Sequence, residues 1–94
     1  MPSNEDAEEA ARDTVAHLGW EAGQAEVLGR PSSAKRMWSL VLRTIRVEQA
    51  RMRARGYFAD DIEREVRSLE RLAERSRRQG AFVASRSGRA KIPS

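Results

Sequence analysis

The sequence contains no cysteine, which excludes a disulfide scaffold, a cysteine-ligated zinc site and a thiol nucleophile. It contains one histidine, His17, so a metal centre built from several histidines is excluded too. Its longest apolar run is the four residues 81–84, whereas a membrane-spanning helix needs about 20. The N-terminal residues have neither the basic nor the apolar region of a secretory signal. We therefore expect a cytoplasmic protein that makes no use of a membrane.

Apolar residues are scarce as well. Hydrophobic residues make up 39% of the 94 residues and charged residues 34%, so little apolar mass is available for a core. A chain of this length forms one domain, and such a domain is stable by only a few kcal/mol. Because oligomerisation is a common way for a small chain to gain core, we expect a homo-oligomer.

The charge of the chain is divided along its length. The net charge is +4, but residues 1–29 carry seven acids and one base, and residues 30–94 carry seventeen bases and seven acids. Nearly all the bases are arginine, which makes bidentate contacts to phosphate and carboxylate groups. This division indicates an anion-binding surface, although charged runs are also common on solvated faces that bind nothing.

Apolar residues recur at spacings of three and four, and no stretch shows the alternation of a strand. This pattern predicts an all-α fold: a small three-helix domain over residues 1–80, with helices at about 4–28, 33–55 and 60–79. The short link between the second and third segments predicts that they form an antiparallel helical hairpin. Residues 81–94, rich in serine and arginine and following Gly80, are predicted to be a flexible basic C-terminal tail.

The three segments differ in their core stripes. The stripe of the first segment is mostly alanine and therefore weak. The second segment has the strongest stripe, formed by Ala34, Met37, Trp38, Val41, Ile45 and Met52. The third has a regular stripe formed by Ile62, Val66, Leu69 and Ala73. Gly19 and Gly23 lower the helix propensity of the first segment, and the sequence leaves open whether the helix bends or breaks near Trp20 or continues through both glycines. Their Gly-x-x-x-Gly spacing is a weak signal on a charged segment.

The side of the second helix opposite its core stripe is the most informative surface in the sequence. It carries arginines with only Glu48 as an internal acid, and we predict that they bind nucleic acid: Arg36, Arg43, Arg46 and Arg53. Three apolar residues lie inside this basic side at a spacing of seven: Leu40, Val47 and Ala54. We predict that these three form a partner interface, although isolated apolar residues are also normal on protein surfaces.

The third helix carries a second row of arginines. Acidic residues four positions earlier can neutralise three of them, through the pairs Asp60–Arg64, Glu63–Arg67 and Glu74–Arg78. Arg71 and Arg75 have no such partner and are further nucleic-acid-binding candidates.

The sequence contains no arrangement of residues that indicates catalysis. His17 lies next to acids on a helix surface without a nucleophile, and the carboxylates from Asp60 to Glu65 surround a helix start rather than converge on a metal. No glycine-rich phosphate loop is present, and neither Gly29 nor Gly56 fits the turn of a helix-turn-helix. We predict no catalytic residue, no cofactor, no metal and no small-molecule substrate, and hence no enzyme.

Two functions remain. The first is a non-enzymatic accessory or regulatory protein that contacts nucleic-acid phosphates through the arginine-rich helix and the tail. The alternative is a protein–protein interaction module, such as an adaptor, inhibitor or antitoxin-like partner, that uses the same Arg/Leu/Val face on an acidic protein.

Overall fold

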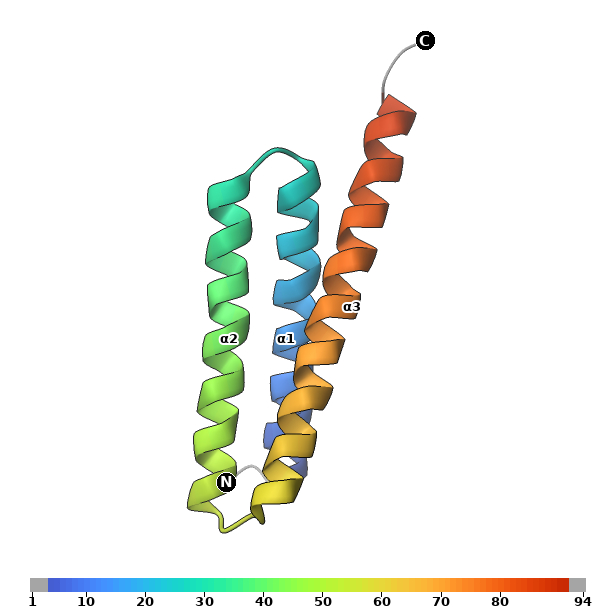
Figure 1. Ribbon diagram of the computed structural model, residues 1–94. Helices are drawn as coiled ribbons and strands as arrows, with labels where there is room; N and C mark the ends of the chain where they lie inside the picture. The colour runs from blue at the N-terminus through green and yellow to red at the C-terminus, as the bar shows by residue number, and fades with distance from the viewer. Residues whose placement is uncertain (1–3, 92–94) are drawn as a thin grey trace.

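The computed structural model describes residues 4–91, with side chains as far as Arg86. It contains three helices, α1 (Asn4–Val27), α2 (Pro31–Ala54) and α3 (Ala59–Lys91), and no strand within residues 4–91 (Figure 1). The predicted all-α fold is confirmed. So is the number of helices, and α2 and α3 run in opposite directions from their short link, as a hairpin does.

Helix α1 lies in the middle of the arrangement. It packs along both other helices, whereas α2 and α3 touch each other much less (Figure 1). The molecule measures 58 × 25 × 22 Å. Its radius of gyration is 15.6 Å, whereas a compact chain of this length would have about 12 Å. The bundle is therefore elongated, and much of α2 faces solvent.

The core is small and comes from all three helices. Val15 of α1, Val41 and Ile45 of α2, and Leu69 and Ala73 of α3 form its centre. Leu18, Trp38 and Val66 pack against this cluster at its margin. The core stripes predicted for the second and third helices are thus the surfaces that they bury.

Glycines allow α1 and α3 to cross with their backbones in contact. A Cβ atom on Gly19 would lie 2.6 Å from the carbonyl oxygen of Ala73, and one on Gly23 would lie 1.9 Å from that of Arg77. On the other helix, a Cβ on Gly80 would lie 2.1 Å from the carbonyl oxygen of Trp20. These are positions that only glycine can fill. Helix α1 is continuous through Gly19 and Gly23, which answers the question that the sequence left open.

The third helix extends beyond its predicted end. We expected it to stop at Gly80 and residues 81–94 to form a tail, but α3 continues to Lys91, and this prediction is wrong for residues 81–91. Gly80 sits inside the helix because the backbone of α1 approaches it, and Ala84, one turn later, is only 4% exposed. Packing against α1 thus outweighs the helix-breaking tendency of glycine. Residues 92–94 lie outside the described residues.

The other helix ends agree with the sequence prediction within two residues. Gly29 and Gly56 follow the ends of α1 and α2 with φ values of 72° and 79°, the left-handed region that favours glycine. Each glycine therefore ends a helix and starts the turn to the next, which sets α2 antiparallel to α1 and to α3.

Candidate functional site

The outward side of α2 is a strongly basic surface. We call it the basic face of α2 and define it by Arg36, Arg43, Arg46 and Arg53, all of which are exposed. Lys35 is exposed at its margin. The one acid of this helix, Glu48, is 5% exposed and points into the bundle. The exposed surface of α2 therefore carries bases and no acid.

The four arginines of the basic face have no partner, unlike six of the other eleven arginines whose side chains the structure describes. Among the described side chains, none of the four forms an ion pair or a side-chain hydrogen bond. By contrast, Arg12 binds Glu65 at 3.0 Å and Arg67 binds Glu63 at 2.5 Å. The guanidinium groups of the basic face are thus available to an external anion.

The basic face has two edges. Arg43 and Val47 line a groove between α2 and α1, and Arg53 lines another between α2 and α3. Because a spacing of seven residues returns to nearly the same side of a helix, Arg36 lies on the edge of Arg43 and Arg46 on the edge of Arg53. The face therefore presents two rows of two arginines each, one on each side of the helix.

Apolar side chains are exposed between and beside these rows. Leu40 is 38% exposed, Val47 is 63% exposed, and Ala54 is exposed as well. The structure thus places the predicted interface residues at the surface. Leu42 of the same helix is also exposed, at 41%. The sequence prediction missed it because it does not share the seven-residue spacing of the other three.

Arg71 and Arg75 of α3 are exposed and have no ion-pair partner among the described side chains. Their neighbours are neutralised as expected, with Arg67 on Glu63 and Arg78 on Glu74, except that Arg64 pairs with Asp61 instead of Asp60. Two residues along a helix correspond to a rotation of about 200°. Because Arg71 lies two residues after the buried Leu69, and Arg43 two residues after the buried Val41, each arginine points away from the core. The structure therefore does not bring the arginines of α2 and α3 together.

The acidic helix α1 does not cover the basic face within one protomer. Its acids Glu8 and Glu26 contact Arg51 and Arg77, and Glu21 lies 4.0 Å from His17. Neither of those arginines belongs to the basic face. The acids of α1 are thus in the same chain as the basic face of α2, but in the fold they contact other residues.

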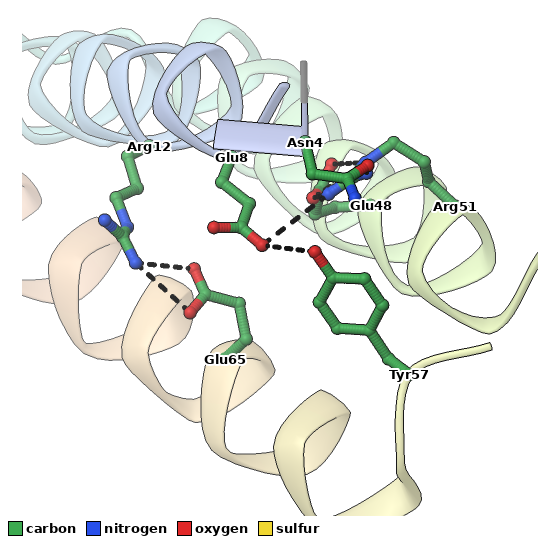
Figure 2. A network of polar contacts seen from close by, with 7 residues as sticks. All are labelled: Asn4, Glu8, Arg12, Glu48, Arg51, Tyr57 and Glu65. Carbon is green, nitrogen blue, oxygen red and sulfur yellow. Dashed lines mark hydrogen bonds and ion pairs between the residues drawn. The ribbon is translucent and has the colours of Figure 1, made fainter. Parts of the chain in front are cut away.

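A polar network fixes the end of α2 that carries Arg53. Arg51 binds the buried Glu48 on its own helix and donates a hydrogen bond to the side-chain oxygen of Asn4 at 3.0 Å (Figure 2). Figure 2 also shows that the hydroxyl of Tyr57 donates to Glu8 at 2.9 Å. This bond to a carboxylate raises the pKa of Tyr57, and the bond to Glu48 raises the pKa of Arg51. The network joins α1, α2 and the link before α3.

A second polar cluster fixes the other end of α2. Arg77 of α3 binds Glu74 and Glu26, and its guanidinium lies 5.5 Å from the centre of the Trp38 ring. The hydrogen bond from Arg77 lowers the pKa of Glu74. These side chains and Lys35 line a cleft of about 450 Å³, in which both acids, Glu26 and Glu74, are paired with Arg77.

Three of the four carboxylates near the start of α3 are likewise paired with arginines. Asp61, Glu63 and Glu65 pair with Arg64, Arg67 and Arg12 respectively. In residues 4–91, no cluster of three acidic, histidine or cysteine side chains is arranged to hold a metal ion. None of the helices in this range combines the length and hydropathy that crossing a bilayer requires.

Comparison of the chain with protein-family models, with curated proteins and with solved structures finds no match.

Proposed function

We propose that the protein binds nucleic acid through the basic face of α2, by contacts to phosphates. The observation that carries this proposal is the exposed surface of α2, where four arginines have no partner and no acid is present. Six of the other eleven described arginines are held in ion pairs, whereas none of the four on this face is.

The spacing of the arginines suits an extended polyanion. Arg36 and Arg53 are 17 residues apart, which is about 25 Å along a helix. This length corresponds to about seven base pairs of duplex, given about 3.4 Å for each phosphate along one strand. The two rows of arginines on opposite edges of α2 can each follow a line of phosphates. Because these contacts reach the backbone rather than base edges, the binding is expected to depend little on sequence.

The dependence of binding on salt tests this proposal. Each phosphate neutralised contributes a slope of about −0.9 to log affinity against log salt for duplex DNA and about −0.7 for a single strand. Fluorescence anisotropy with labelled duplex DNA, single-stranded DNA and RNA between about 50 and 200 mM salt measures this slope. We expect the tightest ligand to show a slope of about −3 or steeper. In a variant in which all four arginines of the basic face are changed to Gln, we expect most of this slope to be lost; these are Arg36, Arg43, Arg46 and Arg53.

A matched control is available on α3. The double variant Arg71→Gln/Arg75→Gln removes two unpaired positive charges from a different helix, and the double variant Arg46→Gln/Arg53→Gln removes the same number from the basic face. We expect the α3 double variant to bind more like the unchanged protein than the α2 double variant does. Absence of binding to all three nucleic acids at about 50 mM salt, or equal losses in the two variants, would contradict the proposal.

A second function is favoured by the apolar residues of the same face. Leu40 and Val47 contribute nothing to phosphate contacts, and their exposure of 38% and 63% suits a protein surface rather than nucleic acid. In this alternative the face binds an acidic protein. Leu40→Gln/Val47→Gln, which keeps every arginine, then abolishes binding to that partner but leaves nucleic-acid affinity unchanged.

A further inference from the structure

A face formed by α1 and α2, on the side away from α3, is open along most of its length. Two hollows mark it, one of about 320 Å³ lined by residues such as Ala10, Thr14 and Val47, and one of about 210 Å³ lined by residues such as Glu21 and Met37. No residue of α3 lines either hollow, whereas the two hollows on the other side of α2 contain residues of α3. We call this surface the α1–α2 face.

Charge is segregated across the α1–α2 face. Glu21 of α1 and Arg43 of α2 line the two hollows. By helical position, Asp13 lies beside the face, three residues after the lining Ala10, and Arg36 lies one heptad before Arg43. Asp13 is exposed, and neither it nor the two arginines has an ion-pair partner among the described side chains. One half of the face is therefore complementary in charge to the other half.

The two halves are also matched in height along the bundle. Because α1 and α2 are antiparallel, a residue late in α1 lies level with one early in α2. The residues lining the first hollow place Ala10 to Thr14 level with Arg43 to Val47. Those lining the second place Glu21 to Leu28 level with Arg30 to Met37. Asp13 is thus level with Arg43, and Glu21 with Arg36.

From this match we infer that the α1–α2 face binds a second copy of the chain. A twofold axis parallel to the bundle and lying in the interface places α1 of each protomer over α2 of the other at unchanged height. Asp13 and Glu21 of one protomer then face Arg43 and Arg36 of its partner, and the symmetric contacts repeat the same pairs. Each α2 packs antiparallel against the partner's α1, which completes a four-helix arrangement.

The apolar residues of the face fit the same arrangement. Val47 is 63% exposed and is level with the exposed Ala10, so the twofold axis places a small side chain opposite a large one. Leu40 lies one heptad before Val47 on the same edge of α2, where it continues the seam. A second copy thus covers apolar surface that one protomer leaves in water.

The inference stands independently of nucleic-acid binding, but the two have a defined relation. A second copy covers Arg36 and Arg43 with carboxylates, while Arg46 and Arg53 lie on the edge of α2 that faces α3 and stay exposed. Dimerisation and nucleic acid therefore compete for one row of arginines.

Charge reversal with mixing tests the inference. Light scattering coupled to size exclusion, without nucleic acid, is expected to give twice the 10.6 kDa of one chain at about 50 mM salt, with dissociation as salt rises. Arg43→Asp and Asp13→Arg are each expected to weaken self-association about tenfold or more, because each homodimer then holds two like-charge contacts. An equimolar mixture is expected to restore the dimer, because in the mixed dimer every contact is between opposite charges.

Arg71→Asp is the matched control, since it makes the same charge change outside the face and is expected to leave the dimer intact. Circular dichroism confirms that each variant remains helical. A monomeric unchanged protein, or two variants that stay monomeric when mixed, would overturn the inference. Nucleic-acid binding by a protein that is monomeric at every salt concentration would overturn it while leaving the proposed function standing. A salt-sensitive dimer that binds no nucleic acid would support the inference and contradict the proposed function.

Discussion

At the scale of single residues, Tyr57 offers a direct probe of the fold because it is the only tyrosine in the chain. Its hydroxyl donates to Glu8, 49 positions away in sequence, and this bond raises the pKa of Tyr57 above the ordinary value of 10.0. Absorbance titration of the tyrosine is therefore expected to give a midpoint above 10.0 in the folded protein. Glu8→Gln is expected to lower that midpoint, because the neutral amide no longer disfavours the phenolate.

The sign of the accompanying change in stability follows from linkage. Since the folded state holds the proton more tightly, the stabilisation by Tyr57 is complete below the unfolded pKa and is lost as pH rises through the folded pKa. Tyr57→Phe is expected to remove this loss in alkaline urea denaturation experiments. A midpoint at or below the ordinary value in the unchanged protein would contradict the bond to Glu8.

Single residues also show what the sequence predicts well and what it does not. The exposure of Arg36, Arg43, Arg46 and Arg53 follows from helical periodicity, because it depends only on which side of α2 is apolar. The bond between Tyr57 and Glu8 could not be predicted, since it depends on how α1 is placed against the link after α2. A raised tyrosine pKa leaves no local signal in the sequence.

At the scale of helices, the crossing of α1 and α3 depends on glycines, because only a residue without a side chain lets the two backbones touch. Gly→Ala normally stabilises a helix by about 1 kcal/mol. At Gly23 the added Cβ would lie 1.9 Å from a backbone oxygen that cannot rotate away, so the helices must separate. We expect Gly23→Ala to destabilise the protein by about 3 kcal/mol, a fall in Tm of about 12 °C or more. Gly80→Ala should follow closely, and Gly19→Ala should cost least.

The control for this series is Gly29→Ala, where nothing lies within 4 Å of the added atom and only the positive φ opposes it. We expect that variant to lose about 1 kcal/mol. Thermal denaturation followed by circular dichroism measures all four variants. A rise in Tm for Gly23→Ala, as helix propensity alone would give, would show that the backbones of α1 and α3 do not touch.

The same glycines explain why the sequence left α1 uncertain and placed the end of α3 too early. Gly19, Gly23 and Gly80 each lower helix propensity, so the sequence does not decide whether the first helix is continuous and favours a third helix that ends at Gly80. In the structure each glycine lies where another backbone approaches, and the packing gained there holds the helix together. Propensity is local, whereas the partner of each glycine is more than 50 residues away, and this is why periodicity predicted α2 better than α1 or α3.

At the scale of the whole molecule, the order of the helices in space differs from their order in the chain. Helix α1 lies between α2 and α3, and it supplies most of the contacts of both. The sequence predicts the hairpin of α2 and α3 from their short link, but a hairpin with few internal contacts does not hold itself. The alanine-rich α1, which has the weakest core stripe, is therefore the helix on which the fold depends.

A fragment tests this dependence. Residues 31–94 contain the whole of α2 and α3 but lack α1, and with it Val15 and two of the three glycines of the crossing, Gly19 and Gly23. We expect the fragment to show much less helicity than the full chain and no cooperative thermal transition. Adding a synthetic peptide of residues 1–29 is expected to restore part of both. A cooperative transition in the fragment alone would show that α2 and α3 form a stable unit without α1.

The central place of α1 also sets the order of events during synthesis. This helix leaves the ribosome before α2 and α3, yet its ion pairs from Arg12 to Glu65 and from Glu26 to Arg77 join residues 53 and 51 positions apart. The nascent chain must therefore expose α1 until α3 has emerged, and the three helices reach their native packing only after α3 has been translated.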